Sequence, residues 1–172
     1  NDFAPIVPEL VRRDWPAIRF VFPHAPVRPV TINNGVRMRA WYDIVGMDFP
    51  TRADAEGVEQ SIAQVTALIE REQARGISPE RILLAGFSQG GAVTLAAGLR
   101  REVPLAGLIA LSTYLPGAEK AARLLGSAAT GQPIFMAHGG SDPVIPLMYA
   151  ERSAQLLESL GFAVQWQRYS MA

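Results

Sequence analysis

The sequence of 172 residues contains no cysteine and only two histidines, His24 and His138. The absence of cysteine excludes disulfides, thiol nucleophiles and cysteine-rich zinc sites. Two histidines also argue against a multi-histidine metal centre, because such a centre needs several imidazole ligands. We therefore expect neither a bound metal nor a cofactor.

The sequence also lacks an excess of either charge and has no long apolar run. Sixteen basic and sixteen acidic residues cancel to a net charge of zero, which argues against nucleic acid or an anionic membrane as the main partner. No segment approaches the ~18 apolar residues that span a bilayer, and no signal peptide is visible. We expect a cytoplasmic protein, a monomer or homodimer, folded as a single domain over residues 1–172.

Apolar periodicity predicts helices that alternate with strands. This order predicts an α/β fold in which a mostly parallel sheet carries helices on both faces. An irregular excursion at 27–43 interrupts the order, with Asn33-Asn34-Gly35 as the turn of a small hairpin. The helices are expected at 3–14, 54–75, 89–101, 117–125 and 146–160, and the strands at 18–22, 81–87, 107–112, 134–138 and 163–169.

The most informative stretch runs from Ile82 to Val93. Gly86-Phe-Ser88-Gln-Gly90 fits the G-x-S-x-G nucleophile elbow, with a buried strand before it and a helix after it, as that motif requires. We expect a strained backbone at Ser88, with the flanking glycines leaving room where a side chain would clash. The alternative is a chance match in a tight turn, but the context favours Ser88 as a nucleophile.

Two further residues suit the same chemistry. Asp142 follows a buried strand in a glycine-rich loop, where a carboxylate can orient a catalytic histidine; the alternative is an aspartate of an ordinary turn before proline. Gln89 follows the nucleophile at the start of a helix, so its backbone N–H is the expected oxyanion donor.

The base that Ser88 needs is not evident in the sequence. The expected order is Ser, Asp, His, and no histidine follows Asp142. His138 precedes Asp142 and suits a bracing role in that loop, and His24 lies in a proline-rich turn. Either could be the base, but a histidine just after Ala172 suits the role better.

Several segments together resemble the carboxylesterase and acyl-protein thioesterase family of α/β-hydrolases, and the small bacterial carboxylesterases in particular. The longer elbow Gly-Phe-Ser-Gln-Gly-Gly is more specific than G-x-S-x-G alone. The matching segments are Phe22–Pro26, Trp41–Asp43, Leu84–Gly91, Ala110–Ser112, His138-Gly139, Asp142-Pro143 and Arg168–Met171.

The resemblance implies an α/β-hydrolase fold with Ser88 as nucleophile, Asp142 as the triad acid and Gln89 as oxyanion donor. It also implies that Trp41, Leu115 and Val144 line an apolar acyl pocket, although core packing would explain the same residues. Family members carry a His-Gly-Leu-Gly segment and a strand before this sequence, and a histidine near position 173. We therefore expect a domain that lacks the N-terminal strand or strands and the C-terminal segment, with a gap in the sheet before 81–87.

These observations predict a serine carboxylesterase that hydrolyses short to medium acyl esters through an acyl-enzyme. One alternative is an acyl-protein thioesterase that acts on lipidated proteins, and another is a non-catalytic α/β-hydrolase-like binding protein. The partner expected is a small-molecule ester or acyl thioester. Because the base is missing, we expect the 172-residue chain itself to be inactive.

Overall fold

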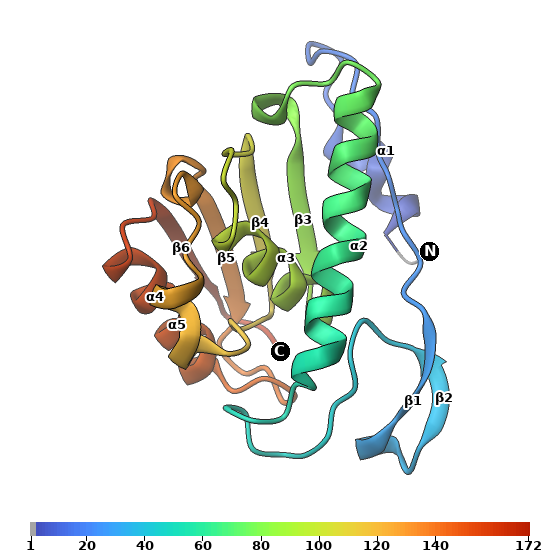
Figure 1. Cartoon of the computed structure of the whole chain (residues 1–172), viewed down its shortest axis with the longest axis vertical. Helices are drawn as coiled ribbons and strands as arrows, with labels where there is room; N and C mark the ends of the chain where they lie inside the picture. Colours follow the sequence, from blue (N-terminus) through green and yellow to red (C-terminus); the bar gives the residue numbers. More distant parts are fainter. Residues whose placement is uncertain (1–2) are drawn as a thin grey trace.

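A parallel sheet of four strands forms the centre of the computed structural model, which describes residues 3–172 (Figure 1). The strands lie in the order β3-β4-β5-β6, and each pairs in parallel with its neighbour. All four strand predictions after residue 80 are confirmed to within two residues. The bounds are β3 (Leu83–Phe87), β4 (Gly107–Leu111), β5 (Ile134–Gly139) and β6 (Val164–Tyr169).

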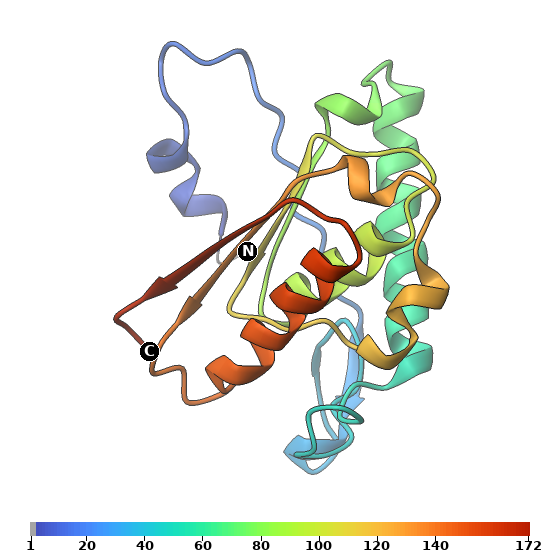
Figure 2. The ribbon, with the colours of Figure 1, turned by 90° about the vertical axis from the view of Figure 1, so that its left-hand side faces the viewer.

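Helices cover the two faces of this sheet unequally. The long helices α2 (Ala55–Ala74), α3 (Gln89–Leu99) and α5 (Leu147–Ser159) lie on one face, with the short α4 (Ala121–Leu124) (Figures 1 and 2). The N-terminal segment, with the short α1 (Val7–Leu10), lies on the other face (Figure 2). There the ring of Phe3 contacts that of Phe87, at 5.8 Å between centroids.

The main core lies between the sheet and the long helices. Helix α2 contributes the apolar stripe that its sequence predicts, and α3 is buried from Gly91 to Leu99. Helix α3 approaches β4 so closely that a Cβ on Gly98 would lie 2.2 Å from Cδ1 of Leu108. Small residues in α3 therefore set how closely the helix that follows Ser88 packs on the sheet.

Asp54 and Gly76 define the two ends of α2. The Asp54 carboxylate accepts hydrogen bonds from the backbone N–H groups of Glu56 (3.2 Å) and Gly57 (3.0 Å), which caps the helix. Gly76 follows the helix with φ of +89°, a conformation that glycine adopts without strain.

The N-terminal part differs from the predictions. Residues 18–22 form no strand, and the predicted helix at 3–14 is reduced to a 3₁₀ turn at Ala4–Ile6 and α1. Among residues 3–172 no strand pairs with 18–22, so this backbone has no ladder to join, and Ile18, Phe20 and Val21 stay exposed. The segment instead runs beside α2, where Arg19 and Glu72 form an ion pair of 3.4 Å. In the part described, β3 is consequently an edge strand of the sheet.

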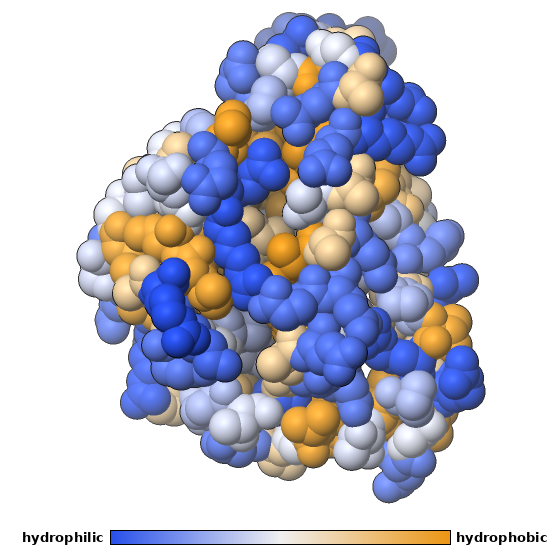
Figure 3. Space-filling view, viewed as in Figure 1, coloured by the Kyte–Doolittle hydropathy of each residue, from blue (hydrophilic) through white to orange (hydrophobic). Residues whose placement is uncertain are grey.

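The predicted hairpin is confirmed. Strands β1 (Val27–Val30) and β2 (Val36–Arg39) pair antiparallel, and Asn34 and Gly35 adopt the positive φ angles of a tight turn, 55° and 73°. Figure 3 shows a mainly hydrophilic surface with separate hydrophobic patches, one of them over this hairpin. Among the helices of residues 3–172, none combines the length and the apolar character that crossing a bilayer requires.

Candidate active site

Ser88 stands at the corner between β3 and α3 in a strained conformation. Its φ of 52° and ψ of −119° lie outside the regions that residues with a Cβ usually adopt. The neighbouring strand holds this backbone: the Ser88 N–H donates to the Leu111 carbonyl (2.9 Å), and the Thr113 hydroxyl donates to the Ser88 carbonyl (2.8 Å). Ser88 itself remains partly exposed. This is the backbone geometry that the G-x-S-x-G pattern predicts.

The glycines around Ser88 differ in what they do. A Cβ on Gly86 would lie 2.1 Å from the Gly90 carbonyl oxygen, and one on Gly91 would lie 2.7 Å from Cγ2 of Thr113. A Cβ on Gly90 would meet only Nε1 of Trp41, at 3.9 Å, which is an ordinary contact. The expectation that both glycines of the short motif prevent a clash is therefore right for Gly86 and wrong for Gly90. The second position that excludes a side chain is Gly91.

Gln89 contributes through both its backbone and its side chain. As the first residue of α3, its N–H has no intrahelical acceptor and finds none among the residues that the structure describes. Its side-chain Oε1 accepts from the Trp41 N–H (3.0 Å), and its Nε2 donates to the Tyr42 carbonyl (2.9 Å). The sequence did not predict that the Gln89 side chain holds the segment Trp41–Asp43. No local pattern relates residues that lie 48 positions apart in the chain.

Asp142 lies in the loop after β5, at the same edge of the sheet as Ser88. Its Oδ1 accepts from the backbone N–H groups of Val144 (2.8 Å) and Ile145 (2.9 Å), and its Oδ2 lies 3.4 Å from Nε2 of His138. The fixed Oδ1 leaves Oδ2 as the oxygen that can receive a further donor.

His138 is buried inside the same loop. Its Nε2 lies 2.8 Å from the Ile145 carbonyl, and only 1% of the residue is exposed. These contacts fit the bracing role suggested for His138. A ring held in this way is poorly placed to exchange protons with a substrate at the surface.

The C-terminal residues lie against the loop that carries Asp142. The Gly140 N–H donates to the Tyr169 carbonyl (2.8 Å), and the Ser141 N–H donates to that of Met171 (3.0 Å). A Cβ on Gly139 would come within 2.8 Å of the Ala172 carbonyl oxygen. The backbone at Ala172 is therefore a neighbour of the Asp142 loop.

The three candidate substrate-binding residues have different environments. Trp41 is half-buried beside the elbow, bonded to Gln89. Val144 is 64% exposed beside Asp142. Leu115 is buried in the main core, where its N–H donates to the Ser153 hydroxyl (2.9 Å), so its surroundings match the core-packing alternative.

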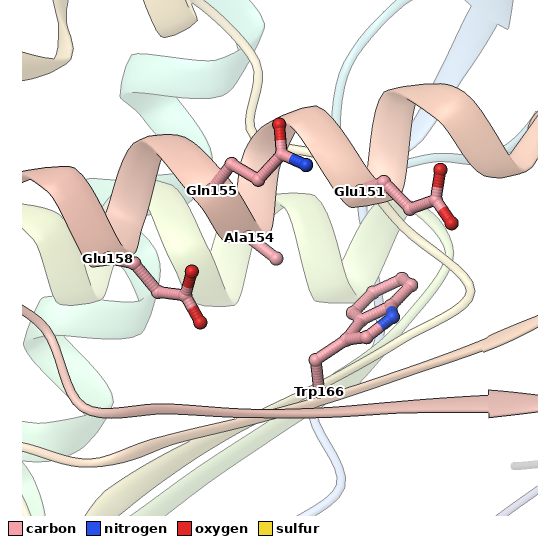
Figure 4. A pocket seen from close by; sticks show the side chains of 5 residues that line it. All are labelled: Glu151, Ala154, Gln155, Glu158 and Trp166. Carbon is pink, nitrogen blue, oxygen red and sulfur yellow. The ribbon is translucent and has the colours of Figure 1, made fainter.

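A cavity of about 230 Å³ lies elsewhere, between α5 and β6 (Figure 4). Trp166 points from the strand toward the helix, and Glu151 and Glu158 lie on either side of it along α5 (Figure 4). This cavity lies under α5, whereas Ser88 and Asp142 follow the ends of β3 and β5, and it is not part of the candidate site. Within residues 3–172, no three histidine, aspartate or glutamate side chains gather in a way that could hold a metal ion.

Residues 9–172 match the family model described as phospholipase/carboxylesterase. The chain is 38% identical over 165 residues to acyl-protein thioesterase 1 of Gibberella zeae, covering 92% of this chain and 70% of that protein. It is 42% identical over 140 residues to acyl-protein thioesterase 1 of Schizosaccharomyces pombe, covering 81% of this chain and 62% of that protein.

The solved structures agree with this match. The crystal structure of Arabidopsis thaliana SOBER1 superimposes with a TM-score of 0.81 at 32% identity, covering 87% of this chain and 72% of that one. This structural likeness confirms the α/β-hydrolase fold that the sequence predicts. The chain therefore belongs to the phospholipase/carboxylesterase family of α/β-hydrolases.

Proposed function

We propose that this protein is a serine hydrolase of carboxylic esters, with acyl thioesters open to the same chemistry. The observation that carries the proposal is the strained corner at Ser88. A residue with φ of 52° inside a well-packed α/β junction persists only where the surroundings enforce it, and such strain is concentrated at functional sites. Membership in the phospholipase/carboxylesterase family supports the same chemistry.

Each group has a defined role in this proposal. The Ser88 hydroxyl attacks the acyl carbon, the carbonyl oxygen becomes an oxyanion, and the Gln89 N–H at the start of α3 donates to that oxyanion. A histidine takes the Ser88 proton and later gives it to the leaving alcohol or thiol, after which water releases the acyl group. Asp142 orients the histidine through Oδ2.

We propose that this histidine follows Ala172. Met171 and Ala172 lie against Gly139 and Ser141, so the next residue emerges beside the loop of Asp142. A chain that ends at Ala172 should then hydrolyse esters orders of magnitude more slowly than one that includes the histidine, because a triad acts as a unit. Full activity of a chain that ends at Ala172 would instead indicate His24 as the base.

Labelling of the natural full-length protein by a fluorophosphonate tests the nucleophile. We expect one adduct at Ser88, located by mass spectrometry of the digested protein, and no adduct in Ser88→Ala. Ser112, which also has a positive φ of 47°, supplies the matched control, and Ser112→Ala should label as the parent does. A folded protein that stays unlabelled at Ser88 would instead support a non-catalytic binding protein.

The second candidate is an acyl-protein thioesterase that acts on lipidated proteins, and the names of the relatives favour it. The values of kcat/KM for a palmitoylated peptide thioester and for short aryl esters separate the two. A serine carboxylesterase of short to medium esters turns over the aryl esters at least tenfold better, and the thioesterase shows the reverse order.

A further inference from the structure

Arg52 is a buried cation without an anionic partner. Only 8% of the residue is exposed, and within residues 3–172 its guanidinium forms no ion pair and no hydrogen bond. Its contact is the ring of Phe49, whose centroid lies 4.3 Å from Cζ. A cation stacks favourably on an aromatic face, but five N–H donors remain unused. No Arg52 nitrogen is among the fully buried atoms that lack a hydrogen-bond partner, so the guanidinium reaches solvent, where an anion from outside can pair with it.

Tyr114 belongs to the same group of side chains. Its hydroxyl is buried, and its polar neighbour is the hydroxyl of Tyr42. Because a hydroxyl both accepts and donates, the Tyr114 O–H remains available to a ligand when Tyr114 accepts from Tyr42. The Tyr114 ring packs edge-on to Phe49 at 5.4 Å between centroids, and the ring of Tyr149 stacks on Phe49 at 4.3 Å. Burial raises the pKa of Tyr114 above its ordinary value of 10, so the phenol stays protonated at neutral pH and can donate a hydrogen bond.

This Arg52 cluster, defined as Phe49, Arg52, Tyr114, Ile145 and Tyr149, adjoins the candidate active site on two sides. Tyr114 follows Thr113, whose hydroxyl holds the Ser88 carbonyl. Ile145, which packs with Phe49 and Tyr114, donates its N–H to Asp142. Arg52 belongs to the loop between β2 and α2, and Figure 1 shows this loop passing below the ends of the central strands.

We propose that Arg52 and the Tyr114 hydroxyl bind an anionic oxygen group, a carboxylate or a phosphate, on the ligand that reaches Ser88. Guanidinium N–H groups form a planar fork that matches two oxygens of either anion, and the phenol adds a third donor. The aromatic rings of Phe49 and Tyr149 limit access of water and strengthen these bonds. The substrate class that follows is an ester or thioester carrying a negative group near the acyl carbon, and this last step rests on the proposed hydrolase function.

Anion binding can be measured without turnover. Titration of the protein with acetate, and separately with inorganic phosphate, at constant ionic strength set by chloride, is followed by ¹H–¹⁵N NMR at the Arg52 Nε–H and the Ile145 amide. We expect saturable shifts with at least one of the two anions, and the stronger one identifies the chemistry. Shifts that rise linearly with both anions, as they do with chloride, would overturn the proposal.

Variants assign the binding to the two donors. Arg52→Gln should weaken the affinity for the anion at least tenfold, Tyr114→Phe should weaken it severalfold, and Arg52→Lys should fall between the parent and Arg52→Gln because it keeps the charge without the fork. Arg123→Gln is the matched control, since Arg123 is exposed on α4 and forms no ion pair in the described chain. Equal weakening by Arg123→Gln would show binding by general charge only.

A kinetic measurement connects the site to catalysis. For the full-length protein, two aryl esters of equal length, one with a neutral acyl chain and one with a terminal carboxylate, give a ratio of kcat/KM. We expect Arg52→Gln to lower the ratio of anionic to neutral ester at least tenfold, whereas a purely structural role of Arg52 would change both esters equally. If neither ester is hydrolysed although the NMR titration saturates, the hydrolase proposal fails and the anion site stands.

Discussion

At the scale of single residues, the glycines at the elbow are not equivalent. Gly86 faces the backbone of Gly90, which cannot move aside, whereas Gly90 faces open space and the distant edge of Trp41. We expect Gly86→Ala to lower the free energy of unfolding by about 1–3 kcal/mol or more through overpacking. Gly90→Ala should leave it unchanged or raise it by up to about 1 kcal/mol, since Gly90 lies in α3 and alanine favours helices. Urea unfolding measures both, and equal losses would contradict the contrast.

The hydrogen bonds of the Gln89 side chain can be tested by a substitution that keeps the shape of the side chain. Gln89→Glu replaces the amide that donates to the Tyr42 carbonyl by an oxygen, so two acceptors then face each other. We expect a loss of about 1–3 kcal/mol in the free energy of unfolding, the cost of an unsatisfied buried group, and a shift of tryptophan fluorescence as the Trp41 turn loosens. Gln64→Glu, on the exposed side of α2, is the matched control and should change neither quantity.

At the scale of elements, the packing of α3 on β4 depends on one close approach. Gly98→Ala would place a methyl group 2.2 Å from Cδ1 of Leu108, a side chain that is only 2% exposed and has little room to turn. We expect a loss of about 1–3 kcal/mol for this change and of about 2–5 kcal/mol for Leu108→Ala. The double variant should lose less than the sum, because the alanine methyl occupies part of the space that Leu108 leaves. Strict additivity in urea unfolding would show that the two residues do not share that space.

The elements also show how far sequence patterns reach. The strands from β3 to β6 and the turn at Ser88 were predictable, because buried runs, glycines and helix caps act within a few residues. The strand at 18–22 was wrongly predicted, since an apolar run becomes a strand only where a partner lies beside it. The hydrogen bonds from Gln89 to Trp41 and Tyr42 could not be predicted from the sequence, and neither could the proximity of Arg52 to Tyr114. In both cases the residues lie far apart in the chain, where no local pattern relates them.

At the scale of the whole molecule, the ion pairs among the described residues differ in how much they can make stability depend on pH. The exposed pair Glu119–Lys120 spans 3.9 Å, whereas Glu59 and Arg100 form two hydrogen bonds that join α2 to the end of α3. Hydrogen bonding from Arg100 lowers the pKa of Glu59 from its ordinary value of 4.5. A lowered carboxyl pKa stabilises the fold above the unfolded value, and this contribution disappears as the pH falls through the folded value.

Replacement of Glu59 therefore has a pH window that can be stated in advance. Because the Glu59 side chain is 58% exposed, Glu59→Gln should lower the free energy of unfolding by no more than about 1 kcal/mol at pH 7. Below pH 4.5 the parent loses the same contribution, so the two proteins should converge, and 1 M salt should shrink the difference at pH 7 because it screens exposed charges. Glu119→Gln is the control, with no measurable change expected at either pH. A difference between Glu59→Gln and the parent that persists undiminished at pH 3 would mean that Glu59 acts through packing on α3 and not through its charge.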